Sequence, residues 1–196
     1  MKYKTLFLLS TIVFRIWHPV FRVSGRENIP QESNYLICPN HCGLADPFWV
    51  IMAIRPPAMP RIMAKDSVMR KPLLGRFLKS IGVIGVRRGE NDIAAVKASL
   101  AALRSGQSLL IFPEGTRNKP GKVVVPKSGA LLLSLRTGTP ILPVYIETKR
   151  FPFSPMRCVI GAPLIPEPGN EHPTPDRLHS GTTALMQTIY ALGEPK

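Results

Sequence analysis

Short apolar runs alternate with helical patterns along most of the chain, and this alternation restricts the fold more than any other feature. Runs typical of buried strands lie at 35–39, 61–65, 82–86, 108–112, 140–146 and 157–161. Patterns typical of helices lie at 46–54, 67–79, 92–103, 128–136 and 176–191, and Pro72 is an alternative start for the second of these. Apolar strands separated by helices of about ten residues are typical of a parallel sheet that is buried on both faces. We therefore predict an α/β fold, a single domain whose mostly parallel central sheet is flanked by helices.

The excess of basic residues indicates a negatively charged partner. The 196 residues include 26 Lys and Arg against 12 Asp and Glu, a formal charge of +14, and the stretch from Arg55 to Arg88 carries nine cations and one acid. Charge alone allows a nucleic acid, an anionic membrane surface or a phosphorylated substrate. The hydrophobic content of 44% excludes disorder driven by charge. Three cysteines, an odd number, do not suit a disulfide framework and indicate a reducing cytoplasm.

The N-terminal segment is the one candidate for membrane contact. Its uncharged run of ten residues, Thr5–Phe14, is too short to span a bilayer, which takes about 20 apolar residues. Basic residues around Leu, Phe and Trp suit a helix that lies in the membrane interface, and the alternative is a helix packed on the domain. We therefore divide the chain into an amphipathic membrane-interface segment at 1–21 and the main domain at 22–196.

The first loop suited to chemistry follows the strand at 35–39 and contains His41 and Asp46. Histidine moves protons near neutral pH, and a carboxylate that accepts its ring N–H fixes the tautomer and stabilises the protonated ring. On a regular helix these two residues would lie about 140° apart. They meet only if His41 lies in the loop and folds back onto the helix start at Asp46, the predicted N-cap residue. The alternative is that Asp46 is only an N-cap and His41 an ordinary loop residue.

The second loop, at 112–117, follows another apolar strand and has the groups that hold an anion. Gly115 exposes a main-chain N–H, Thr116 offers a hydroxyl, and Arg117 offers a planar fork matched to phosphate. Lys127 follows as a further cation. These residues predict an anion site at the end of the strand, and the alternative is a solvated basic turn.

These loops resemble the motifs of the glycerophospholipid acyltransferases, specifically the 1-acyl-glycerol-3-phosphate (lysophosphatidic acid) acyltransferase family. The N-H-x4-D motif of that family is matched by Asn40, His41 and Asp46, and its F-P-E-G-T-R motif by residues 112–117. Four weaker elements also match. They are a lead-in at 23–30, a partial G-x-x-F-I-x-R motif at 82–88, a K-x-G-A element at 127–130 and a V-P-type strand at 141–145. The partial motif has Gly85 where Phe is usual and keeps its final Arg88. The likeness runs from about residue 22 to residue 161 in the family's order.

The resemblance implies transfer of a fatty acyl group from a thioester donor, acyl-CoA or acyl-carrier protein, to the free hydroxyl of 1-acyl-glycerol-3-phosphate. The product would be phosphatidic acid, made in phospholipid biosynthesis. His41 would be the general base, oriented by Asp46, and no metal or other cofactor is expected. The residues expected to bind the acceptor are Arg88, Glu114, Gly115, Thr116, Arg117 and Lys127. Glu114, an acid at a phosphate site, is expected to bind a hydroxyl or to orient Arg88 or Arg117.

The expected location is the cytoplasmic face of a membrane, as a peripheral or monotopic enzyme on an anionic surface, without a nucleic-acid partner. Within the family, the acceptor could instead be glycerol-3-phosphate, another lysophospholipid or a lyso-aminolipid. Other classes are a basic nucleic-acid-binding domain, a thioesterase and an inactive membrane scaffold. An acyl intermediate on Cys42 and a zinc site at Cys38, His41, Cys42 and Cys158 are the remaining alternatives that the residues allow.

Overall fold

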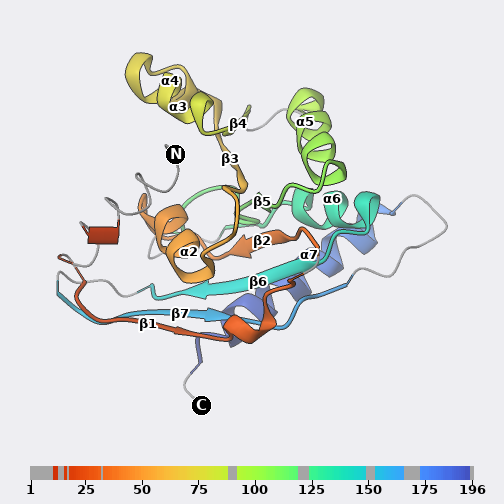
Figure 1. Cartoon of the computed structure of the whole chain (residues 1–196). Helices are drawn as coiled ribbons and strands as arrows, with labels where there is room; N and C mark the ends of the chain where they lie inside the picture. Colours follow the sequence, from red (N-terminus) through yellow and green to blue (C-terminus); the bar gives the residue numbers. More distant parts are fainter. Residues whose placement is uncertain are drawn as a thin grey trace.

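A computed structural model describes residues 11–12, 16, 18–31, 33–87, 92–118, 124–148, 153–165 and 173–194 of the protein. The strands are β1 (Phe21–Ser24), β2 (Leu36–Pro39), β3 (Arg61–Lys65), β4 (Ile84–Val86), β5 (Leu109–Leu110), β6 (Ile141–Ile146) and β7 (Met156–Ile160). The helices are α2 (Asp46–Ile54), α3 (Asp66–Met69), α4 (Pro72–Ser80), α5 (Ile93–Arg104), α6 (Gly129–Thr137) and α7 (Pro175–Ala191), with a 3-10 turn, η1, at Arg26–Asn28. Within the described residues the strands form one seven-stranded sheet in the order β1-β7-β6-β2-β5-β3-β4 (Figure 1).

Most of the sheet is parallel, which confirms the predicted α/β fold. β2 pairs in parallel with β5 and β6, and β3 pairs in parallel with β4 and β5. β7 runs antiparallel to β6 and pairs in parallel with β1 at the edge. Only nine residues, 147–155, join β6 to β7. A parallel crossover needs about a dozen residues or more, so the chain reverses at this point.

The core lies on both faces of the sheet because successive strand residues point to opposite sides. On one face, Ile37 and Leu110 belong to a buried cluster with the residues of α2. On the other face, Leu36 and Leu109 belong to a second cluster with residues of α5, α6 and α7. Strands buried on both sides read as continuous apolar runs, which is why the sequence pattern located them.

The differences from the predicted elements are local. The helix predicted at 67–79 is two helices, α3 and α4, because Lys71 before Pro72 has an extended backbone. The strand predicted at 108–112 is reduced to the two residues of β5. β1 is absent from the prediction, since four residues of alternating burial make too short a pattern to distinguish from a loop.

The end of the N-terminal segment packs on the domain. His18 is 6% exposed, and the rings of His18 and Phe21 lie 5.4 Å and 5.1 Å from that of Trp49 on α2. Apart from 11–12, 16 and 18–21, the segment predicted at 1–21 lies outside the described residues. Among the residues that are described, no helix is both long enough and apolar enough to cross a membrane.

The five strands β2 to β6 run in one direction, and their carboxyl ends lie together at one edge of the sheet, at the left of β2 and β6 in Figure 1. Because β2 and β5 are neighbours in the sheet, the loop after β2 lies beside the loop after β5. The two loops that the sequence singled out are therefore adjacent, although their residues are far apart along the chain. This edge is where sites form in open α/β sheets.

Candidate active site

His41 and Asp46 meet in the loop between β2 and α2. Nδ1 of His41 lies 2.8 Å from Oδ2 of Asp46, whose side chain is fully buried, while 14% of the His41 side chain is exposed. A neutral ring that donates its Nδ1–H to a carboxylate keeps the lone pair on Nε2 free. The geometry is that of a histidine able to accept a proton at Nε2, with a buried carboxylate holding the ring in place.

Asp46 is not the N-cap residue that the sequence predicted. It is the first residue of α2, and Ala45 holds the N-cap position. Besides the histidine ring, Oδ2 of Asp46 accepts the main-chain N–H groups of Cys42 at 2.6 Å and Gly43 at 2.8 Å. The prediction is wrong because these donors come from the preceding loop and not from the first turn of the helix. The carboxylate thereby folds the loop back and brings His41 to it.

Asn40 fixes the start of this loop. Its side chain is fully buried and pairs with the end of β6, since Nδ2 donates to the Ile146 carbonyl at 2.9 Å. Its Oδ1 accepts the Ile146 main-chain N–H at 2.7 Å. Through these two hydrogen bonds the Asn40 side-chain amide pairs with the main chain of Ile146, in place of a further β2 residue in the β2–β6 ladder. The loop therefore leaves the sheet at a defined position immediately before His41.

The loop after β5 forms one wall of the site. The ring of Phe112 stacks on the ring of His41, with centroids 4.1 Å apart and planes inclined by 27°. The Asn118 main-chain N–H donates to the His41 carbonyl at 2.7 Å. These contacts restrict the rotation of the imidazole and shield one of its faces from water.

Glu114 is buried behind His41, with 3% of its surface exposed. Its Oε1 accepts the His41 main-chain N–H at 2.9 Å and the Tyr190 hydroxyl at 3.1 Å. The Asn118 side-chain amide in turn donates to the Tyr190 hydroxyl at 3.1 Å. Burial raises the pKa of the Glu114 carboxyl, and it also raises the pKa of Tyr190 to about 12. Oε2 of Glu114 is buried and has no hydrogen-bond partner among the described residues.

The residues expected to bind an anion lie beside this centre. Thr116, Arg117 and Lys127 are exposed at the mouth of the loop. The Lys127 main-chain N–H donates to the Pro113 carbonyl at 2.7 Å, and Lys127 Cγ lies 3.2 Å from where a Cβ on Gly115 would be. Lys127 is thus fixed to the second loop through its main chain, and Arg117 directly precedes Asn118, whose main-chain N–H donates to the His41 carbonyl. Arg88, the third expected cation, lies outside the described residues.

The expectation for Gly115 in this loop needs correction, and one of the three roles expected for Glu114 is tested. The main-chain N–H of Gly115 donates to the Phe112 carbonyl at 2.9 Å, so it is not the open anion donor that the sequence predicted. The φ of +63° at Gly115 shows that the glycine serves the turn itself. Within the described residues Glu114 makes no ion pair with Arg117; its carboxylate points to His41 and Tyr190. The other two roles expected for Glu114, binding a hydroxyl or orienting Arg88, stay predictions, since Arg88 lies outside the described residues.

Three residues contribute to the site without having been predicted from the sequence: Phe112, whose ring stacks on His41, Asn118 and Tyr190. Tyr190 lies on α7, 76 residues after Glu114, so no local spacing could have indicated it. Asn118 follows the F-P-E-G-T-R stretch directly and could have been found as a polar residue at a strand end. No group of three or more His, Cys, Asp or Glu side chains among the described residues is placed to hold a metal ion.

Comparison with known proteins matches the chain to a family model and to curated relatives. The family model described as Acyltransferase matches residues 20–147, which include the loops of His41 and Glu114 and exclude Tyr190. A 1-acyl-sn-glycerol-3-phosphate acyltransferase from Borreliella burgdorferi is 43% identical over 124 residues, 62% of this chain and 49% of that protein. A protein of the same description from Bacillus subtilis is 29% identical over 176 residues, 87% of each chain. The chain thus spans about half the length of the first relative and most of the second.

A solved structure shares the fold. The crystal structure of the 1-acyl-sn-glycerophosphate (LPA) acyltransferase from Thermotoga maritima superposes with a TM-score of 0.68 and covers 92% of this chain and 75% of its own. At 24% sequence identity this likeness shows the fold alone.

Proposed function

Because the chain belongs to the acyltransferase family, we propose that it transfers a fatty acyl group from a thioester to the free hydroxyl of 1-acyl-glycerol-3-phosphate, giving phosphatidic acid. The relatives from two bacteria described by this activity support the choice of acceptor. The single observation that carries the proposal is the His41–Asp46 pair at 2.8 Å, with the ring at the carboxyl edge of the sheet and Nε2 left as a base.

The proposed reaction needs no nucleophile from the protein. Nε2 of His41 takes the proton of the acceptor hydroxyl while the hydroxyl oxygen attacks the thioester carbonyl carbon. The tetrahedral intermediate collapses with cleavage of the C–S bond, and the leaving thiolate takes the proton from the imidazolium. Asp46 stabilises the positive ring between these two steps, as a carboxylate does in hydrolase triads. The products are phosphatidic acid and the free thiol of the donor.

The proposed phosphate site is the exposed face of the second loop. The exposed Arg117 and Lys127 are proposed to supply the charge, and the exposed Thr116 adds a hydroxyl. Phosphate held there by charge-assisted hydrogen bonds would place the neighbouring glycerol hydroxyl towards the histidine. Arg88 is proposed as a further ligand from the sequence motif alone. The proposed part of Gly115 is to form the turn that carries these groups.

Glu114 is proposed to position the acceptor and the base together. Oε1 already holds the main-chain N–H of His41, whereas Oε2 is buried and unpartnered among the described residues. Buried polar atoms are rarely left without a hydrogen bond, so Oε2 is suited to accept one from a glycerol hydroxyl.

The donor, the location and the domain division are proposals of the same kind. Acyl-CoA and acyl-carrier protein both fit a basic surface, and both present the same thioester. A lysophospholipid acceptor resides in membranes, so we place the protein peripherally or monotopically on the cytoplasmic face, with 1–21 as the interface segment and 22–196 as the acyltransferase domain. An anionic lipid surface, rather than a nucleic acid, is the proposed partner of the basic residues.

One assay tests the proposed function. Purified protein is offered acyl-CoA and acyl-carrier-protein donors with acceptors that include 1-acyl-glycerol-3-phosphate, glycerol-3-phosphate and lysophosphatidylcholine. Phosphatidic acid formation that disappears in His41→Ala is the expected result. Thioester hydrolysis that is indifferent to acceptors would identify a thioesterase instead. Preferential acylation of another acceptor would keep the reaction class and replace the substrate.

A further inference from the structure

The hairpin of α3 and α4 stands at the end of the sheet beyond β3 and β4 (Figure 1). α3 begins at Asp66, directly after the carboxyl end of β3. β3 is parallel to β5, whose own carboxyl end leads into the loop of Glu114. The hairpin therefore leaves the sheet at the same edge as the candidate active site.

α4 turns apolar side chains away from the protein. Its single buried residue is Gly75, while Leu73, Leu74 and Phe77 are 82%, 42% and 38% exposed. At 100° per residue these three side chains lie within an arc of about 100° on the helix. Single exposed apolar residues are ordinary on protein surfaces, but three large ones on one short helix face form a patch.

Glycine contacts hold the helix in this orientation. A Cβ on Gly75 would lie 2.0 Å from the Met69 carbonyl oxygen, so the backbones of α4 and α3 meet there with no room for a side chain. A Cβ on Gly85 of β4 would lie 3.2 Å from Met69 Cγ and 3.5 Å from Asp66 Oδ1. A side chain at this position would therefore press on Met69 of α3. Close backbone packing, and not loose association, leaves the Leu73 face pointing outward.

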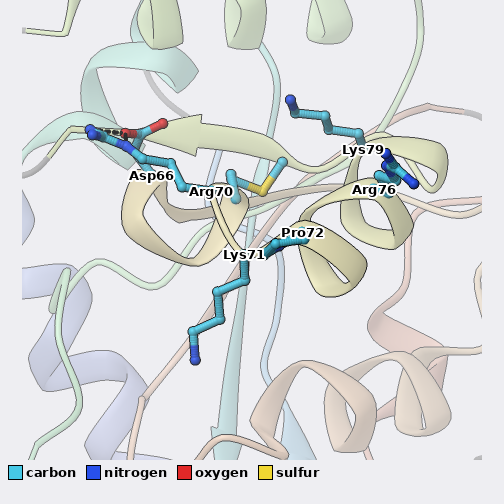
Figure 2. A pocket seen from close by; sticks show the side chains of 7 residues that line it. Asp66, Arg70, Lys71, Pro72, Arg76 and Lys79 are labelled. Carbon is cyan, nitrogen blue, oxygen red and sulfur yellow. Dashed lines mark hydrogen bonds and ion pairs between the residues drawn. The ribbon is translucent and has the colours of Figure 1, made fainter.

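Basic side chains surround a pocket of about 350 Å³ in this hairpin (Figure 2). Its polar lining is one acid with four cations: Asp66, Arg70, Lys71, Arg76 and Lys79. Nε of Arg70 donates to Oδ2 of Asp66 at 2.7 Å, which neutralises that pair. The other three cations make no ion pair with any residue that the structure describes.

We propose that the α3–α4 hairpin docks on the surface of an anionic phospholipid membrane. The apolar face of α4 would enter the boundary between headgroups and acyl chains. The three cations without an ion pair in the described residues, Lys71, Arg76 and Lys79, would bind lipid phosphates. Cationic side chains next to exposed Leu and Phe on one amphipathic helix are the composition of interfacial helices. Charge complementarity therefore selects an anionic lipid surface over a neutral one.

Docking through the hairpin would turn the carboxyl edge of the sheet, where His41 lies, towards the membrane. An acceptor with one acyl chain in the bilayer would then reach the base without leaving the lipid. This link to catalysis rests on the proposed function, whereas docking itself does not, because vesicle binding is measured without substrate or donor.

The first test compares two pairs of substitutions that remove the same charge. The test variant combines Arg76→Gln and Lys79→Gln in the hairpin. The control variant combines Arg104→Gln and Arg136→Gln, in the last turns of α5 and α6. These turns precede β5 and β6, so they lie at the amino ends of the strands, at the opposite edge of the sheet. Sedimentation with phosphatidylglycerol vesicles should show an affinity loss of about 30-fold for the hairpin pair and less than about threefold for the control. Equal losses in both pairs would overturn the proposal, since net charge alone would then explain binding.

The second test asks whether the apolar face enters lipid. In a Trp17→Phe background, Phe77→Trp places a fluorescent probe on the face, and Trp49, 2% exposed, remains as an internal reference. Ile93→Trp on α5, where the native side chain is 65% exposed, is the control. Brominated lipids in bound vesicles should quench the probe at 77 and spare the probe at 93.

Absence of quenching at 77 in vesicle-bound protein would overturn the proposal. A second copy of the chain is the other possible occupant of this face. Dimers detected by sedimentation, and lost in the double variant Leu73→Ser, Leu74→Ser, would identify that second copy. This result would overturn docking on a lipid surface.

Discussion

The main-chain N–H of His41 donates a 2.9 Å hydrogen bond to Glu114, a residue 73 positions later in the chain. The bond joins the loop after β2 to the loop after β5, and Phe112 stacks on the His41 ring from the same second loop. The proposed base and the proposed acceptor loop are therefore joined in one packed unit. A change in either loop is expected to move the other.

Replacement of Asp46 should reduce acyl transfer far more than it reduces stability. In Asp46→Asn the side chain can still accept from Cys42 and Gly43, but it no longer supplies the negative charge that stabilises a protonated His41. We expect kcat to fall by about 10³ to 10⁴-fold, the range found for comparable triad and general-base changes. Steady-state kinetics measure the loss, and Asp176→Asn at an exposed position on α7 is the control. An Asp46→Asn enzyme with near-normal kcat would remove Asp46 from the mechanism.

Glu114→Gln should become more stable relative to the natural protein as the pH rises. Burial raises the pKa of Glu114, so the folded state binds its proton more tightly than the unfolded state does. That contribution to stability is present below the unfolded-state pKa and is lost as the pH rises through the raised folded-state pKa. Glutamine cannot ionise, so the difference in unfolding free energy should grow by about 1.4 kcal/mol per unit of pKa shift. Urea unfolding from about pH 4 to about pH 8 measures it, since linkage follows proton binding.

The matched control for this pH series is Glu194→Gln, which removes an exposed carboxylate beyond the end of α7. A constant difference between Glu114→Gln and the natural protein at every pH would contradict a raised pKa at Glu114.

Tyr190→Phe should slow the reaction without weakening acceptor binding. The substitution removes the hydroxyl that donates to Glu114 and accepts from Asn118, so the support behind His41 loosens. Loss of such a buried hydrogen bond costs about 1 kcal/mol of stability. We expect kcat to fall about three- to tenfold with KM unchanged, because Tyr190 acts through Glu114 as a positioning residue.

Tyr145→Phe is the control for this pair of measurements, since it removes a hydroxyl from a buried tyrosine on β6 that lies against Arg157. A purely structural role of Tyr190 would lower the unfolding free energy and leave kcat at its natural value.

Arg117→Ala and Lys127→Ala should impair the use of phosphate-bearing acceptors selectively. Each change removes an exposed cation beside the His41 loop. The KM for 1-acyl-glycerol-3-phosphate should rise about tenfold or more, the equivalent of one charge-assisted hydrogen bond. Monoacylglycerol, which lacks the phosphate, should be used equally by variant and natural enzyme, and Arg136→Ala on α6 should change neither acceptor. Parallel losses with both acceptors would argue against a phosphate site at this loop.

Gly75→Ala should destabilise the protein although alanine is the better helix former. The new Cβ would lie 2.0 Å from the Met69 carbonyl oxygen, so α4 must move away from α3. Overpacking of this kind costs about 1–3 kcal/mol. Gly129→Ala in α6, whose Cβ would have its nearest contact at 3.8 Å, should be neutral or stabilising. Thermal unfolding of the two variants provides the comparison, and equal melting temperatures would show that α4 yields without cost.

Local sequence patterns determined the layout of the fold and the positions of both site loops. The apolar runs that became β2 and β6 and the amphipathic pattern of α5 depend on residues close together in the chain, so periodicity located them. His41, Asp46 and the 112–117 stretch were located as residues directly after such strands. The strand at β1 was not predicted because its four residues are too few to form a pattern, whereas the sequence marks Pro72 as an alternative helix start and α4 begins there.

Only the tertiary structure decided what these residues contact. The N-cap role expected for Asp46 gave way to three hydrogen bonds from its own preceding loop. Glu114, expected near cations, is buried against the His41 main chain and against Tyr190 from the last helix. These partners depend on β2 lying next to β5 and on α7 packing over that face of the sheet. Strand order and helix docking are set by the burial of the whole core, and no local spacing in the sequence encodes them.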